Sequence, residues 1–408
     1  MSLLREGLAT GVVQETGQAV KHTIDGVTGT YRVYRIRIDQ LYYNNHNDRI
    51  ATWLSKWRAD HEGADPISLP QNEYNNIIES FIVESNTDAI RSTQKNIATF
   101  GQRVPGVVLN DGLVIDGNRR LTCIRRNAAE KNKVGWFEAV ILSDEVASDP
   151  KRIKLLELSI QHGEEGKVDY DPIERLVGVY NDIIKERLLT KAEYARSTGM
   201  TEASVQKLID QAGYMHDFLE FCNAPEQYYL ARQLAIAGPL GEMSAILRKC
   251  KYDSERQQVK EYIFANILAQ PEGDITRFVR KFKRVIGTDQ AGEFYGEEQT
   301  AFQKLIPVMG TKPMTVGKVQ AIRGDDRVSG GFRRAMEKAD RKAKLGKMAN
   351  APSTKSKEAL SDLRQIMPAM LRQMSRDELS DLRYTLEQIV TETQHVIDSV
   401  DQQMNRLA

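Results

Sequence analysis

Hydrophobic and polar residues alternate along several short segments in the first third of the chain. Residues 31–41 (YRVYRIRIDQL) alternate with the period of a β-strand, and residues 107–109, 113–115 and 136–142 are short apolar runs. In residues 31–41 both registers carry apolar side chains, so the pattern does not decide which face is buried. Residues 1–30 are short alternating stretches broken by glycines, which predicts an extended arm or a small β-hairpin.

Helical spacing of apolar residues accounts for most of the remaining chain. It appears in residues 50–60, 72–86, 89–100 and 151–161, and it dominates after residue 171. The expected fold class is therefore α+β, with an N-terminal α/β domain followed by all-α regions. From Leu379 to Val400 the apolar residues follow heptad spacing, which favours a coiled coil or a helical-hairpin dimer. Packing of this segment on the chain's own helices is the alternative.

Composition limits the range of functions. The chain has 408 residues, with 28% charged and 41% hydrophobic, and its net charge is +1. A nucleic-acid surface would therefore have to be local. The three cysteines, Cys123, Cys222 and Cys250, are far apart, so neither a zinc site nor a disulfide framework is expected. No apolar run reaches the ~20 residues of a membrane helix, and no signal peptide is recognised. We expect a cytoplasmic protein.

The stretch at residues 107–126 (VVLNDGLVIDGNRRLTCIRR) predicts strand, turn, strand, turn and helix. Arg119 and Arg120 fall in the first turn of that helix, at the positive end of its dipole, where cations are disfavoured unless an anion is present. A glycine turn with free backbone N–H groups and two guanidinium groups favours an anion site. In the alternative interpretation, Asp116 caps the helix and the arginines are solvated or paired with acids.

Residues 190–213 (TKAEYARSTGMTEASVQKLIDQAG) have the spacing of a helix-turn-helix. Ala195 occupies the position where the helices cross, Gly199 lies in the turn, and Val205 and Leu208 point into the junction. The second helix would expose short polar side chains suited to base edges and phosphates: Thr201, Glu202, Ser204, Gln206 and Lys207. An ordinary helical hairpin is the alternative.

Two further segments are basic. Residues 274–285 (DITRFVRKFKRV) predict an amphipathic helix whose outward face is rich in Arg and Lys, suited either to phosphate contacts or to solvent. Residues 311–350 are rich in Gly, Lys and Arg and are expected to form a flexible or partly helical basic linker.

The box at residues 113–121 (LVIDGNRRL) resembles the arginine box of the ParB/sulfiredoxin superfamily. The order of neighbouring features is also similar: an Asn-rich loop that ends at Arg49, a Gly-Gln helix end at residues 101–102, an Asp-Pro-Ile-Glu helix start at residues 171–174, and the helix-turn-helix. The resemblance covers about residues 31–225. The domains expected are therefore an arm at 1–30, a nucleotide-binding domain at 31–165, a DNA-binding domain at 166–225, a helical region with a basic linker at 226–350 and a helical hairpin or coiled coil at 351–408.

The resemblance implies a ParB-like protein that binds double-stranded DNA. Its N-terminal domain would bind a nucleoside triphosphate with Mg²⁺, CTP being favoured over ATP, and would gate a DNA clamp or a DNA-partition or regulatory complex in a nucleoid-associated homodimer. The residues implied in nucleotide binding are Gly117, Asn118, Arg119, Arg120 and Arg49.

This sequence departs from the family pattern in two places. An insertion at about residues 51–76 separates the Asn-rich loop from the next matching helix. The family segment that serves the metal and hydrolysis aligns on residues 158–162, where its glutamate is missing, although Glu157 is adjacent and Glu164 and Glu165 are near. The catalytic residues are therefore unknown, and slow hydrolysis of CTP or ATP is left open.

Two other function classes remain open. The chain could be a ParB/sulfiredoxin-fold enzyme, either a nucleotide hydrolase or a nuclease of a phage or mobile element, or a transcription regulator with a degenerate pocket. No cluster of acids and histidines has nuclease spacing. Cys123 is expected to be a packed cysteine, because it lies inside the helix rather than at its N-terminal end.

Overall fold

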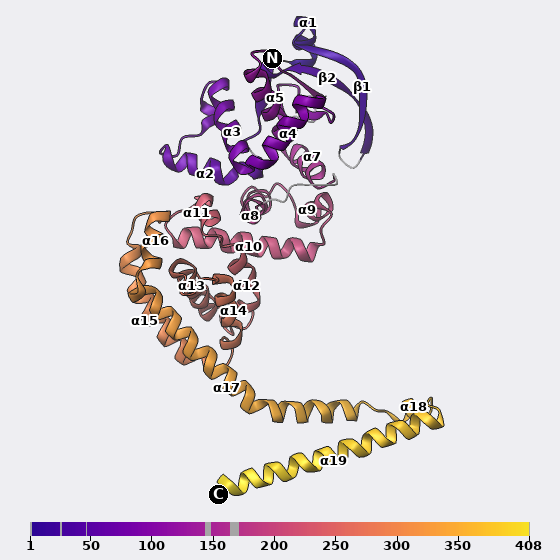
Figure 1. The fold of residues 1–408 in the computed structure, drawn as a ribbon, viewed down its shortest axis with the longest axis vertical. Coiled ribbons are helices and arrows are strands. Elements are labelled where there is room, and N and C mark those ends of the chain that lie inside the picture. Colours follow the sequence, from indigo (N-terminus) through magenta and orange to yellow (C-terminus); the bar gives the residue numbers. More distant parts are fainter. Residues whose placement is uncertain (1, 25–26, 46, 143–147, 164–170, 408) are drawn as a thin grey trace. The chain divides into compact units, whose positions relative to one another are not determined.

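The computed structural model describes residues 2–24, 27–45, 47–142, 148–163 and 171–407 (Figure 1). These divide into two compact units, Met1–Asp340 and Arg341–Ala408. The first unit contains a β-sheet with covering helices and a larger helical part, so the mixed N-terminal region and helical remainder expected from the sequence are confirmed. No helix in these ranges combines the length and the apolar character needed to cross a membrane.

Six strands of the described chain form one mixed sheet in the order β1-β2-β6-β4-β5-β3. Antiparallel pairs join β1 to β2, β2 to β6 and β4 to β5, whereas β4–β6 and β3–β5 are parallel. The expected domain boundary at residue 30 falls inside β2, because the N-terminal hairpin belongs to the same sheet. The strands are β1 (Val13–Ile24), β2 (Val27–Arg37), β3 (Tyr42–Tyr43), β4 (Gly106–Leu109), β5 (Leu113–Asp116) and β6 (Trp136–Leu142).

Both faces of the sheet are covered, which explains the ambiguous pattern of residues 31–41. Ile36, Val108 and Val114 face a core built with helices α3 (Gln71–Ser85), α4 (Thr87–Phe100) and α5 (Asn118–Glu130). The alternate positions Val33, Val107 and Ile115 face a smaller core, to which α7 (Pro150–Gly163) contributes Leu156 and Ile160. The two alternating sets of side chains on these strands are therefore both buried, one in each core. Short elements complete this part: η1 (Leu3–Gly7), α1 (Leu8–Thr10), η2 (Ile38–Gln40), η3 (Asp48–Ile50), α2 (Ala51–Asp60) and η4 (Pro66–Ser68).

The helical part of the first unit surrounds a core of phenylalanines. Phe218, Phe264, Phe278, Phe282 and Phe294 are fully buried, and several contact one another edge to face. The elements are α8 (Pro172–Val179), η5 (Tyr180–Lys185), α9 (Lys191–Thr198), α10 (Glu202–Phe221), α11 (Tyr228–Gln233), α12 (Ala237–Leu247), α13 (Asp253–Ala269), α14 (Ile275–Val285), α15 (Ala291–Met309), α16 (Val316–Gly324) and α17 (Asp326–Arg364).

The segment expected to be a basic linker, residues 311–350, is helical. It contains α16 and the first part of α17, and Phe332, Met336 and Ala339 of α17 are buried. Their spacing of four and three residues places them on one face of the helix. The Lys- and Arg-rich face therefore belongs to a packed helix rather than to a flexible tether.

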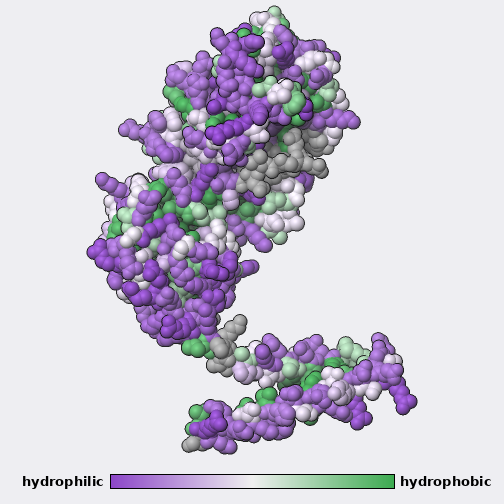
Figure 2. All heavy atoms as spheres, in the orientation of Figure 1, coloured by the Kyte–Doolittle hydropathy of each residue, from purple (hydrophilic) through white to green (hydrophobic). Residues whose placement is uncertain are grey.

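The second unit consists of the end of α17, α18 (Pro368–Leu371) and α19 (Arg376–Leu407). Ser375 and Glu378 form the expected capping box, in which the backbone N–H of Ser375 donates to Glu378 Oε2 at 2.7 Å. Among the side chains described in residues 341–408, none is buried. Figure 2 shows hydrophobic residues on the surface of this unit. They include Ile389, Val396 and Val400 of the heptad segment.

Candidate functional site

The turn before α5 requires a glycine. Gly117 has φ +98°, and a Cβ atom there would lie 2.8 Å from Phe137 Cζ. Gly117 is the N-cap residue, and no side chain caps the helix, so Asp116 does not serve as the cap. Asn118 is buried, and its Oδ1 atom has no hydrogen-bond partner in the described structure. The first turn of α5 therefore presents backbone N–H groups without a side-chain acceptor, beside a buried polar group that is also unsatisfied.

The two arginines of this turn differ. Arg120 Nη2 donates to Asp116 Oδ2 at 2.5 Å, so its charge is paired within the chain. Burial lowers the pKa of Arg119, and the charge of Arg49 lowers it further. The positive charge of Arg49 thus adds to the positive potential around Arg119, and such a potential favours a bound anion. Of the alternatives left open by the sequence, pairing with an acid holds for Arg120.

A buried charge cluster lies directly beside Arg49. Lys154 Nζ of α7 is 3.0 Å from Asp48 Oδ2, 3.5 Å from Asp182 Oδ2 of η5 and 3.6 Å from Glu157 Oε2 of its own helix. Burial opposes the charge of Lys154, but the three carboxylates together raise its pKa well above the ordinary value. Burial also raises the pKa of Asp182 to about 8. The sequence interpretation missed this cluster, although Lys154 and Asp182 interrupt apolar helical runs.

A second buried network holds the residues that follow Arg49. Thr52 Oγ1 of α2 donates to Glu174 Oε1 at 2.9 Å and accepts from Arg232 Nη1 at 3.1 Å. The Arg232 guanidinium lies 3.6 Å from the centre of the Trp53 ring and 3.2 Å from Asp171 Oδ2. The inserted segment is thus attached to the start of α8 and the last turn of α11 rather than projecting from the domain.

The residues expected to contact DNA lie at the start of α10. Gly199 ends α9 with φ +68°, and Thr201 caps α10 by accepting from the backbone N–H of Ser204 at 3.2 Å. Ala195 and Val205 are buried at the junction, whereas Leu208 is only half-buried. Ser204 is half-buried, and the other expected contacts are exposed: Thr201, Glu202, Gln206 and Lys207. Gln206 donates to Asp210 at 2.9 Å, and Lys191 lies 3.6 Å from Glu202.

The basic face of α14 is largely neutralised by acids of the same unit. Arg280 lies 2.7 Å from Glu242, which also pairs with Lys283. Lys281 pairs with Glu272, and Arg284 pairs with Asp340 at 2.5 Å. These side chains are therefore less suited to phosphate contacts than the sequence suggested.

Most of the residues considered for metal binding and catalysis are either buried or outside the described residues. Leu158 and Ile160 of α7 are buried in the core, and the Ser159 hydroxyl donates to the carbonyl of Leu156 at 2.9 Å. The side chains of Gln161 and His162, together with Glu164 and Glu165, lie outside the described residues. In the part of the chain that is described, no group of three or more His, Cys, Asp or Glu could hold a metal ion.

Cys123 is a packed residue. Its thiol has no exposed surface and donates to the carbonyl of Ile90 at 3.6 Å. Burial raises its pKa to about 11, so it is held as the thiol at neutral pH. This agrees with the interpretation of Cys123 as a structural residue.

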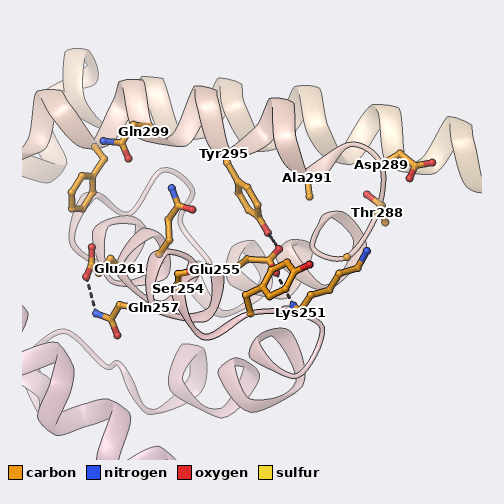
Figure 3. Close-up of a pocket in the computed structure, with 14 residues that line it drawn as sticks. Lys251, Ser254, Glu255, Gln257, Glu261, Thr288, Asp289, Ala291, Tyr295 and Gln299 are labelled. Atoms are coloured by element: carbon orange, nitrogen blue, oxygen red, sulfur yellow. Dashed lines mark hydrogen bonds between the residues drawn. The ribbon is translucent and has the colours of Figure 1, made fainter.

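A cavity of about 790 Å³ lies elsewhere, between α13 and α15 (Figure 3). Two pairs of its polar side chains are hydrogen-bonded: Tyr295 Oη donates to Glu255 at 2.7 Å, and Gln257 donates to Glu261 at 2.7 Å. None of the residues expected to bind nucleotide or DNA lines it. We assign it no part in the site.

Comparison with known proteins leaves the family open. No protein-family model matches the chain, and no curated protein does. One solved structure that aligns with it is the C2221 form of a Pnob8-like ParB-N domain, at 12% identity, covering 76% of this chain and 97% of that chain. The TM-score is 0.25. This superposition is too poor to support a shared fold or function, so the function is argued from the residues.

Proposed function

We propose that this chain is a ParB-like DNA-binding protein whose sheet domain binds a nucleoside triphosphate with Mg²⁺ and thereby controls how the protein holds DNA. The observation that carries the proposal is the uncapped first turn of α5, which follows Gly117 and contains Arg119, in the positive potential to which Arg49 adds. Guanidinium groups and free backbone N–H groups are the donors that phosphates prefer. The resemblance of residues 113–121 to the family's arginine box supports a nucleotide rather than a simple ion.

Roles within the box follow from the contacts of each residue. Gly117 lets the backbone approach the ligand closely, and Arg119 and Arg49 bind phosphate oxygens. Asn118 Oδ1 accepts a hydrogen bond from a hydroxyl or amino group of the ligand. Arg120 shares its charge with Asp116, so its contribution is smaller. Mg²⁺ would be held mainly by the phosphates and water, because it keeps much of its hydration shell at such sites. Glu157, the acid nearest to the family position, is 2% exposed and lies close to Lys154, so we propose no hydrolytic role for it.

Calorimetric titration tests the nucleotide site. The full-length protein is titrated with CTP, ATP and GTP, each with Mg²⁺, and we expect CTP to bind most tightly. Arg119→Ala abolishes binding, Arg120→Ala weakens it less, and Arg126→Ala leaves it unchanged, because Arg126 is an exposed arginine farther along the same helix. Absence of binding by all three nucleotides, or equal loss in Arg126→Ala, contradicts the proposal.

DNA binding is assigned to the start of α10. Gln206 and Lys207 are exposed there, and long polar side chains at such positions reach base edges and phosphates. Gln206→Ala and Lys207→Ala should weaken binding to duplex DNA, measured by fluorescence anisotropy. Lys304→Ala, on α15, is the matched control for loss of one surface charge. If the control variant loses as much affinity as Lys207→Ala, DNA binds elsewhere.

A homodimer formed through α19 completes the proposal. The heptad residues of this 32-residue helix are exposed or half-buried in the single chain. An amphipathic helix gains most of its stability from packing its apolar face. A second copy of the chain offers an identical stripe with the same spacing, and two joined DNA-binding domains are what a clamp requires.

A further inference from the structure

The segment that carries Arg49 is fixed on both sides by buried polar contacts. Asp48 precedes Arg49 in η3, and Thr52 follows it in the first turn of α2; both are buried. Asp48 is bonded to Lys154 of α7, and Thr52 is bonded to Glu174 of α8. The position of Arg49 is therefore set by helices that lie more than 100 residues later in the chain.

Helix α8 passes unusually close to the Asp48 carboxylate. A Cβ atom at Gly178 would lie 2.5 Å from Asp48 Oδ2, so glycine is needed for this approach. The carboxylate thus lies between the Lys154 ammonium and the backbone of α8. Because the charges are removed from water, separating them would leave an uncompensated charge in the interior. Asp48, Lys154 and α8 are therefore expected to move together.

The same cluster reaches the helix pair α9–α10. Asp182 of η5 contacts Lys154, and the carbonyl of Asp182 accepts a hydrogen bond at 3.0 Å from the backbone N–H of Leu189, shortly before α9. Lys151 of α7, one turn before Lys154, lies 2.7 Å from Glu193 of α9. Helix α7 therefore carries one ion pair to Asp48, the neighbour of Arg49, and another to Glu193 in the first helix of the pair.

We infer that Asp48 and Lys154 are positioning residues that couple occupancy of the Arg49–Arg119 anion site to the DNA-binding helix pair α9–α10. This inference rests on the proposed function. When an anion draws Arg49 and Arg119 together, η3 shifts, and the ion pair of Asp48 with Lys154 carries that shift to α7 and η5. Neither residue needs to touch the nucleotide or the DNA. Coupling requires that the two states of the linked elements differ in their contacts with the ligand.

The test compares nucleotide affinity with and without DNA. Full-length protein is titrated with Mg²⁺–CTP in the absence and presence of a mixed-sequence duplex, and the ratio of the two dissociation constants measures the coupling. For the wild type we expect a ratio that departs from one by about 5- to 150-fold. In Asp48→Asn, which keeps the side-chain shape but removes the charge, CTP still binds without DNA and the ratio falls to within about twofold of one.

Control variants separate coupling from folding. Lys56→Met removes an exposed ion pair on α2, with Asp60, and should retain the wild-type ratio. Circular dichroism and the thermal midpoint verify the fold of each variant. If Asp48→Asn does not fold, Asp182→Ala replaces it, because this change removes the contact of Lys154 with η5 whatever the protonation of Asp182, and leaves Asp48 in place. The same loss of coupling is expected.

Each outcome bears on a different statement. If the folded variant shows the wild-type ratio of dissociation constants, the inferred coupling through Asp48 and Lys154 is wrong. It is also wrong if the variant no longer binds CTP in the absence of DNA, because the replaced residue would then belong to the nucleotide site itself. A wild type that binds CTP with the same affinity in both conditions overturns the linkage but leaves nucleotide binding in place. A wild type that binds none of CTP, ATP or GTP overturns the proposed function and the linkage together.

Discussion

Replacing Glu298 by glutamine should make the helical part of the first unit more stable at neutral pH. Glu298 of α15 and Asn266 of α13 have no exposed surface. Asn266 Nδ2 donates to Glu298 Oε2 at 2.7 Å, whereas Glu298 Oε1 and Asn266 Oδ1 lack partners in the described structure. A protonated carboxyl group supplies the donor that this pair lacks. Burial accordingly raises the pKa of Glu298 well above its ordinary value of 4.5.

The size of the effect follows from the proton balance. Because the pKa is raised in the folded state, the stabilisation is fully present below pH 4.5 and is lost as the pH rises toward the folded-state pKa. A fully developed shift costs about 1.4 kcal/mol per pH unit, so about 2.7 kcal/mol is the upper limit for the loss of wild-type stability between pH 5.5 and pH 7.5. Glutamine has no proton to lose and keeps one donor and one acceptor for Asn266. Glu298→Gln should therefore gain stability relative to the wild type over the same interval, by up to this amount.

Hydrogen exchange measures this locally. Protection of the α13 and α15 amides is followed by mass spectrometry at pH 5.5 and pH 7.5, with correction for the intrinsic exchange rates. Glu297→Gln is the matched control, because Glu297 is half exposed and pairs with Lys338 at the surface. Such a pair contributes at most about 1 kcal/mol. Parallel changes in protection for the wild type and Glu298→Gln would show that Glu298 is ionised in the folded protein and would refute the reasoning.

Three further changes test the site and the assembly. Gly117→Ala should destabilise the fold by about 1–3 kcal/mol in thermal denaturation and abolish nucleotide binding, because alanine there meets both a positive φ and a clash with Phe137. Gly63 also has a positive φ but no atoms near its Cβ position, so Gly63→Ala should cost less stability. Equal losses of stability in the two variants contradict this prediction. Lys207→Ala should reduce the slope of log K for DNA against log salt by about 1, and an unchanged slope excludes a phosphate contact. Ile389→Asp should convert the dimer to monomer in analytical ultracentrifugation, and a persistent dimer rules out the α19 seam.

Local patterns identified the elements whose contacts are close in sequence. The hairpin of β4 and β5 follows from its Asn-Asp-Gly turn, and α9 and α10 follow from their caps and the glycine between them. The pattern could not give the parallel pairing of β3 with β5 or of β4 with β6, because no local rule selects partners across such distances. Residues 311–350 are rich in Gly, Lys and Arg, which suggested a flexible or partly helical linker, although the buried positions 332, 336 and 339 have helical spacing.

The same distinction applies to the candidate site. Asp116 and Arg120 are four residues apart, so their pairing lay within the alternatives that the sequence offered. Asp48 and Lys154 are 106 residues apart, and only the folded chain brings them together. A lysine or an aspartate at an apolar helical position is a signal that some buried partner exists, but it does not identify the partner.

The inserted segment after Arg49 changes how movement in this protein should be understood. From the sequence it interrupts a family pattern and adds a helix. In the structure, Thr52 of that helix joins Glu174 and Arg232, and burial raises the pKa of Glu174 to about 8. Any rotation of the sheet domain against α8 and α11 must break this network. The Glu174 carboxyl would then be exposed to water or left buried without a hydrogen-bond partner. A nucleotide-driven change therefore has to move η3, α2 and α8 together, and the insertion makes this chain stiffer at the point where its two proposed binding functions meet.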